Sequence, residues 1–141
     1  MGGAAEATVA RVMRELGAAG LRLTGARRRL LGVFAGLGRW CTPQELHAAA
    51  KDQGCSVGLA TVYRFLGTLL EHGLCRAFPQ PDGSTRYVLC PPGHHHHLIC
   101  RRCGRVADVA DCRVEAPAGD FLVEEHAIDF FGLCPACRGG S

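Results

Sequence analysis

Apolar side chains recur at helical spacing through the first half of the chain. Residues 6–19 predict a first helix, and a second helix, capped by Thr24, carries its apolar positions on one face. At 42–45 the run Thr-Pro-Gln-Glu joins a favoured N-cap, a proline at the first helical position and a glutamate that completes a capping box. This third helix is expected to run to about Asp52, and a fourth to begin at Ser56.

The fourth helix is expected to end at Gly73, and two strand-like runs follow at 74–78 and 85–89, around the turn Pro81-Asp82-Gly83. Helices followed by a β-hairpin are the pattern of a winged helix-turn-helix. A generic small α+β domain contains the same elements. The basic charge of this region favours the winged form of an α+β fold.

The run Cys90-Pro91-Pro92-Gly93 marks a boundary, because two prolines and a glycine cannot continue a regular element there. Beyond it the pattern is strand-like at 94–100, at 105–111 and within 121–133. We therefore expect a winged-helix domain over 1–89, a hinge at 90–93 and a second domain over 94–141.

Charge is distributed unevenly over the 141 residues, whose formal net charge is +3. Residues 1–90 hold 11 Lys/Arg against 6 Asp/Glu, whereas 91–141 hold 5 against 7. The first part suits a polyanionic partner and the second suits cations. No apolar run approaches the roughly 18 residues of a membrane span, and residues 1–6 lack the pattern of a signal peptide. Nine cysteines then predict metal binding in the reducing cytoplasm rather than disulfides.

Two Cys-x-x-Cys pairs stand in the second part, Cys100 with Cys103 and Cys134 with Cys137. Two-residue spacing lets both thiolates of a pair bind one tetrahedral ion, and two pairs predict a closed structural zinc site. Four buried free cysteines are the alternative, which the repeated spacing disfavours.

Four histidines, His94 to His97, directly precede the first pair. Alternate side chains of a strand face opposite ways, so His95 and His97 share one face and His94 and His96 share the other. Each face can give two imidazoles to one ion. The run therefore predicts two half-sites, with a solvated histidine cluster as the alternative.

Together these features resemble the Fur family of metal-responsive repressors over roughly residues 16–138. The motifs that carry the resemblance are Leu23-Thr24 with Arg27-Arg28, Gln44–His47, Leu59–Arg64, His94–Cys103 and Phe131–Cys137. The resemblance implies a DNA-binding winged helix and a small α/β dimerisation domain with structural zinc. It also implies no enzymatic activity and no small-molecule substrate.

By the same resemblance the fourth helix, taken from about Gly58 to His72, reads double-stranded DNA through Thr61, Tyr63 and Arg64, and a homodimer binds a palindromic operator. An arginine there can contact a phosphate or the edge of guanine, and a tyrosine a phosphate or a thymine methyl. Arg27 and Arg28 would add phosphate contacts. The alternative for Tyr63 is a packing role alone.

Iron-sensing members of the family tend to carry an acidic ligand just after the aromatic residue of the last wing strand. Here Tyr87 is followed by valine, and Cys90 lies three residues past it. This resembles the zinc-sensing branch, and thiolate with imidazole favours zinc over iron or manganese. We assign the sensing site to Cys90, His95 and His97, with Cys75 or water as the candidate fourth ligand.

The resemblance also implies a second regulatory site of His94, His96, Glu115 and His126. Family members usually carry a helix of several turns after the position of Glu115. In this chain a proline and a glycine follow within four residues and leave little more than one turn. The dimer surface is therefore expected to differ.

The expected function is repression of zinc-uptake genes, with zinc as the co-repressor that fixes the DNA-binding orientation of the dimer. Each protomer would hold one structural zinc and one or two regulatory ions. A family member that senses iron, manganese, nickel or peroxide is the first alternative. A zinc hydrolase lacks support because no His-Glu-x-x-His motif is present, and an interaction module that does not bind DNA is the third alternative.

Overall fold

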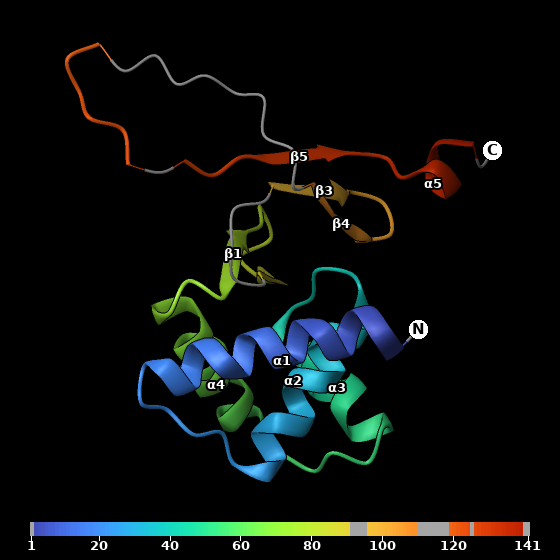
Figure 1. Ribbon diagram of the computed structural model, residues 1–141. Helices are drawn as coiled ribbons and strands as arrows, with labels where there is room; N and C mark the ends of the chain where they lie inside the picture. Colours follow the sequence, from blue (N-terminus) through green and yellow to red (C-terminus); the bar gives the residue numbers. More distant parts are fainter. Residues whose placement is uncertain (1, 91–95, 110–118, 125, 140–141) are drawn as a thin grey trace. The chain divides into compact units, whose positions relative to one another are not determined.

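The computed structural model describes residues 2–90, 96–109, 119–124 and 126–139 (Figure 1). The chain divides into two compact units, residues 1–92 and 93–141. No helix in the described part of the chain combines the length and apolarity that crossing a bilayer requires.

Four helices form most of the first unit: α1 (Gly2–Ala18), α2 (Gly25–Leu37), α3 (Pro43–Asp52) and α4 (Leu59–Glu71). Their apolar faces meet in one core, which includes Leu16, Leu30, Phe34, Leu46 and Phe65. All four predicted helices are present, and α1 begins several residues before the expected residue 6.

Side-chain caps set two of the helix starts as the sequence predicts. The hydroxyl of Thr24 accepts a hydrogen bond from the backbone N–H of Arg27 at 3.2 Å. Thr42 and Glu45 form the complete capping box, with N–H to oxygen distances of 3.1 and 2.9 Å. Each cap satisfies backbone N–H groups that a helix terminus leaves unpaired.

The N-cap of α4 is Gly58 and the helix begins at Leu59, which differs from the Ser56 start of the apolar pattern and agrees with the Gly58 start that the family resemblance implies. Cys55 is buried, and its N–H donates to the carbonyl of Ala50 at 2.8 Å. These contacts hold the chain against α3, so the helix begins only after them. Gly73, in the left-handed region at φ 68°, follows the end of α4 as predicted.

The wing is the antiparallel pair β1 (Cys75–Pro79) and β2 (Thr85–Leu89), each within one residue of its predicted bounds. Cys41 extends the hairpin by pairing with Tyr87 through two backbone bonds of 3.1 and 2.8 Å. Arg86 of β2 forms an ion pair with Glu45 of α3 at 2.9 Å. The wing is thereby attached to α3, and the winged helix is confirmed.

The second unit contains a three-stranded sheet and a short helix. The central strand β3 (His96–Cys100) pairs antiparallel with β4 (Val106–Val109) and parallel with β5 (Asp129–Gly132). Helix α5 (Pro135–Gly139) follows. The strands lie inside the predicted runs, and the whole chain has the expected α+β class.

Substituting Thr42 by alanine removes one half of the capping box. We expect a loss of about 1 kcal/mol in the free energy of unfolding of the first unit. Denaturant titration followed by the fluorescence of Trp40, the chain's one tryptophan, measures it. Thr42→Ser keeps the hydroxyl and serves as the control; an equal loss in both variants would contradict the capping role.

Candidate metal centres and nucleic-acid interface

The four predicted cysteines form one cluster in the second unit. The sulfur atoms of Cys100, Cys103, Cys134 and Cys137 all lie within 4.8 Å of one another, and those of Cys103 and Cys134 are 3.7 Å apart. A tetrahedral zinc with bonds of about 2.3 Å to sulfur requires neighbouring sulfurs about 3.8 Å apart. The cluster is therefore positioned to bind a structural zinc.

Backbone geometry brings the two pairs together. Cys100 ends β3, and the following turn returns through Gly104, whose N–H donates to the Cys100 carbonyl at 2.9 Å. The N–H of Arg101 donates to the carbonyl of Gly132 at 2.8 Å, which holds the end of β5 beside this turn. Cys134 and Cys137 then stand one helical turn apart at α5.

The thiols of Cys100 and Cys137 have pKa values shifted in opposite directions before metal binding. Backbone N–H groups, that of Cys103 first, lower the pKa of the Cys100 thiol to about 6. Burial and the neighbouring thiols raise the pKa of Cys137 to about 12. A bound zinc would favour the thiolate form of all four.

His97 lies at the centre of the sheet, 2 % exposed, between two aspartates. Asp108 of β4 and Asp129 of β5 are its direct cross-strand partners. The Nδ1 atom of His97 lies 3.2 Å from the Asp129 carboxylate, and Nε2 lies 3.7 Å from that of Asp108. Each ring nitrogen therefore faces its own carboxylate.

His96 makes different contacts from its neighbour. Its ring is 2 % exposed and stacks on that of His126, with ring centroids 5.3 Å apart. The structure thus brings together two of the four residues predicted for the second regulatory site. The other two, His94 and Glu115, lie outside the described residues, as does His95 of the sensing site.

Cys90 and Cys75, the remaining candidate ligands, belong to the first unit. Cys90 directly follows β2, is 6 % exposed, and donates its backbone N–H to the carbonyl of Leu74 at 2.9 Å. Cys75 lies in the hydrophobic core, where burial, and then the nearby thiol of Cys90, raise its pKa. Its role as fourth ligand stays a prediction.

Three further cysteines had no assigned role. Cys41 and Cys55 are buried, as expected of thiols that pack as small apolar side chains, and Cys112 lies outside the described residues. Burial raises the pKa of Cys41 to about 12.

The predicted DNA-reading residues lie on the exposed side of α4. Tyr63 is 47 % exposed, while Val62, Phe65, Leu66 and Leu69 on the other side are buried. Arg64 donates to the hydroxyl of Thr61 at 3.2 Å. The amide of Gln44, on α3, donates to the hydroxyl of Tyr63 at 3.0 Å.

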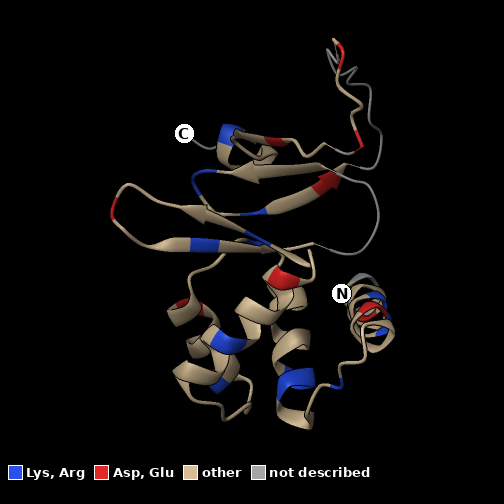
Figure 2. Ribbon diagram, turned by 90° about the vertical axis from the view of Figure 1, so that its left-hand side faces the viewer, with Lys and Arg blue, Asp and Glu red and all other residues tan. Residues whose placement is uncertain are grey.

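Basic residues also occupy the first turn of α2 (Figure 2). Arg28 and Arg29 are exposed and Arg27 is half-buried. These side chains are accessible to an anionic partner, which the predicted phosphate contacts of Arg27 and Arg28 require.

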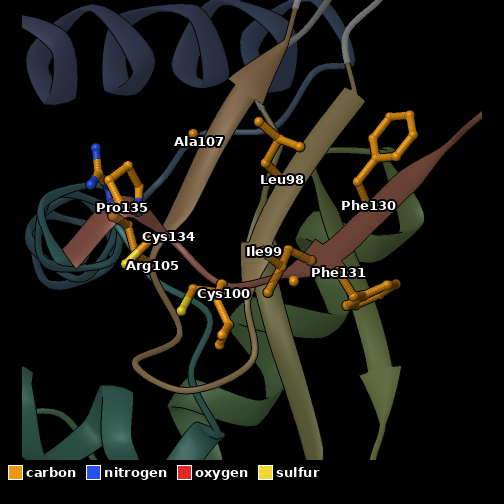
Figure 3. A pocket seen from close by; sticks show the side chains of 11 residues that line it. Leu98, Ile99, Cys100, Arg105, Ala107, Phe130, Phe131, Cys134 and Pro135 are labelled. Atoms are coloured by element: carbon orange, nitrogen blue, oxygen red, sulfur yellow. The ribbon is translucent and has the colours of Figure 1, made fainter. Parts of the chain in front are cut away.

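An apolar groove of about 370 Å³ runs along the sheet of the second unit (Figure 3). Leu98, Phe130, Phe131 and Leu133 line it, all between 40 and 49 % exposed. Arg105 lies among the lining residues, as do two members of the thiol cluster, Cys100 and Cys134.

Sequence reasoning missed three residues: Asp108, Asp129 and Gln44. Asp108 is a polar residue within the strand-like run at 105–111, and Asp129 directly precedes a pair of phenylalanines. Both strands were therefore recognisable. Their pairing with His97 depends on strand register, which the sequence pattern left open. Gln44 was noted only as part of a motif, and its partner lies 19 residues away.

The fold and the two kinds of site define a metal-binding, DNA-binding regulator. The model of the ferric uptake regulator family matches residues 18–129 of the chain. The zinc uptake regulation protein of Mycobacterium tuberculosis is 36 % identical over 129 residues, which are 87 % of this chain and 99 % of that protein. The ferric uptake regulation protein of Legionella pneumophila is 31 % identical over 132 residues, which are 89 % of this chain and 97 % of that protein.

Among solved structures, a zinc uptake regulator in complex with zinc and DNA has a TM-score of 0.67 at 27 % identity and covers 95 % of each chain. The chain therefore belongs to the ferric uptake regulator family. Its members are metal-responsive transcriptional regulators and not enzymes, and the chain shares that class.

Substituting Cys103 by serine removes one zinc ligand. Because a structural site contributes folding free energy directly, we expect loss of one bound zinc and loss of protection from hydrogen exchange in β3 and β5. Cys55→Ser, a buried thiol outside the cluster, is the control and should keep the zinc. Retained sheet protection in Cys103→Ser after complete metal removal would contradict the structural role.

Proposed function

We propose that the chain is a zinc-responsive repressor of zinc-uptake genes that binds DNA when its regulatory site is loaded. What supports the choice of metal is the donor set assigned from the sequence, the thiol of Cys90 with the imidazoles of His95 and His97; Cys90 and His97 are both buried. Sulfur and imidazole donors favour zinc over iron or manganese. The similarity to a zinc uptake regulation protein along 87 % of the chain supports the same choice.

The proposed sensing site takes Cys90 from the first unit and His95 and His97 from the second. Asp129 lies 3.2 Å from Nδ1 of His97, and as the acceptor of an Nδ1 proton it would leave the lone pair on Nε2 for a metal. Asp108 faces that nitrogen at 3.7 Å. One ion with bonds of about 2.0–2.2 Å can join the two atoms, so Asp108 becomes a candidate fourth ligand beside Cys75 and water.

The proposed second regulatory site contains His94, His96, Glu115 and His126. The stacked rings of His96 and His126 support it, because two imidazoles side by side can turn toward one ion. The contacts of His96 and His97 differ, which supports two sites rather than one.

The proposed mechanism depends on the position of Cys90 directly after the wing. Zinc, when bound by Cys90 and the histidines, would hold the two units in one relative orientation. If that orientation alone fits two operator half-sites, loading of the site raises DNA affinity by selecting it. The backbone bond from Cys90 to Leu74 ties this ligand to the residue that precedes β1.

The proposed partners are a second copy of the chain and a palindromic operator, read in the cytoplasm. Two symmetry-related α4 helices would enter successive major grooves. The apolar groove along β3 and β5 supports a dimer surface in the second unit, because its exposed phenylalanines gain burial there.

A regulator of another metal is the second candidate function. The ferric uptake regulation protein of Legionella pneumophila, at 31 % identity over 89 % of the chain, supports it. The proposed ligand set with Asp108 in place of Cys75 has one sulfur donor and still favours zinc.

Cys90→Ser removes the proposed soft ligand without emptying the four-cysteine site. We expect the variant to keep its structural zinc and its fold and to lose the tightening of DNA binding by added zinc.

Asp108→Asn should raise the zinc concentration needed for tight DNA binding about 10- to 100-fold. Fluorescence anisotropy with DNA selected by the wild-type protein from a random pool measures both. A wild-type response retained in Cys90→Ser would contradict the assignment.

Arg64→Ala removes the proposed base contact. We expect a loss of about 1–3 kcal/mol for the selected duplex and a smaller loss for an unrelated one. Arg28→Ala, a phosphate contact, should weaken both duplexes alike and lower the salt dependence. Unchanged affinity for the selected duplex in Arg64→Ala would contradict the proposed base contact, whereas a wild-type protein that selects no duplex from the pool would favour a module that does not bind DNA.

A further inference from the structure

We propose that Gln44 is a positioning residue for DNA recognition: it holds the Tyr63 side chain and directs its phenolic proton outward. This rests on the proposed function, in which Tyr63 contacts DNA. The carrying observation is the hydrogen bond from the Gln44 amide nitrogen on α3 to the Tyr63 oxygen on α4, 3.0 Å long.

Gln44 is available for this contact because its neighbours perform the capping. Thr42 and Glu45 exchange the two capping bonds, and Glu45 also pairs with Arg86. Proline occupies the first helical position. Gln44 is left with no part in the cap, and its side chain reaches the neighbouring helix.

The direction of the hydrogen bond determines what Tyr63 can offer a ligand. A phenol carries one proton and accepts through its oxygen. Because the oxygen accepts from Gln44, the proton points elsewhere and stays available as a donor. A phosphate oxygen or the carbonyl of a base is a suitable acceptor, since both occur along DNA.

The contact also limits the freedom of an exposed ring. Tyr63 is 47 % exposed, so packing alone leaves its side chain rotamer weakly determined. A side chain already held in its bound geometry loses less entropy when it binds. Arg64, on the same exposed side, is held in a similar way by Thr61 at 3.2 Å. Each of the two proposed reading residues is therefore restricted by a hydrogen bond before DNA binds.

A double-mutant cycle tests the proposal. The probe is the duplex that the wild-type protein selects from a random pool, with zinc present. Gln44→Met and Tyr63→Phe should each weaken binding about 3- to 10-fold, and the double variant should bind no more weakly than Tyr63→Phe alone. Gln53→Met, an exposed glutamine at the other end of α3, is the matched control and should bind like wild type.

Gln44→Glu adds a readout that a structural role would not give. A carboxylate accepts the phenolic proton and turns it away from DNA, and its charge also repels phosphate. We expect a larger loss than for Gln44→Met in the wild-type background. In the Tyr63→Phe background there is no phenolic proton and only the charge repulsion remains, so Gln44→Glu should lower DNA affinity less than it does in the wild-type background. Melting temperatures of all variants should match that of Gln53→Met.

Three results would overturn the inference. Equal losses from Gln44→Met in the wild-type and Tyr63→Phe backgrounds would mean that Gln44 acts by itself. A loss of DNA affinity in Tyr63→Phe with no loss in Gln44→Met would show that Gln44 does not position Tyr63, and it would leave the proposed function intact. No loss in either Tyr63→Phe or Tyr63→Ala would remove both the positioning role and the proposed DNA contact of Tyr63.

Discussion

The cluster of four cysteine thiols is the feature on which we expect the stability of the second unit to depend. In its described residues, Ile99 is the only aliphatic side chain that is buried, whereas Leu98, Phe130, Phe131 and Leu133 remain exposed. Apolar burial of this size contributes little to folding. A zinc bound by Cys100, Cys103, Cys134 and Cys137 would supply folding free energy that this apolar burial does not provide, and a partner at the exposed face would add more. In our proposal, folding, metal binding and assembly are therefore linked in this unit.

The first unit does not share this dependence, because a continuous apolar core joins its helices. Glu45 occupies a central position: it caps α3, pairs with Arg86 of the wing, and stands next to Gln44, which contacts α4. These contacts preset the proposed DNA-reading surface. In our account metal changes how two such surfaces are oriented and leaves each surface itself unchanged.

Local signals allowed most elements to be predicted, and contacts between distant residues limited the rest. The capping box at Thr42 and the stop at Gly73 follow from neighbouring residues and are confirmed. The start of α4 was placed too early by the sequence pattern, because buried Cys55 and its backbone bond to Ala50 hold this stretch of chain against the end of α3. The spacing of cysteines predicted the thiol cluster. The carboxylates beside His97 lie 11 and 32 positions away in the chain, and only strand register brings them there.

The central claim is that a sulfur-containing sensing site makes DNA binding respond to zinc. A titration of wild-type DNA binding against buffered free zinc, ferrous iron and manganese, each alone and anaerobically, tests it most directly. The structural site is filled with zinc beforehand. The account predicts that zinc tightens binding at free concentrations well below those at which iron or manganese acts. Tightening by iron or manganese at equal or lower concentrations, or tight binding without any added metal, would contradict it.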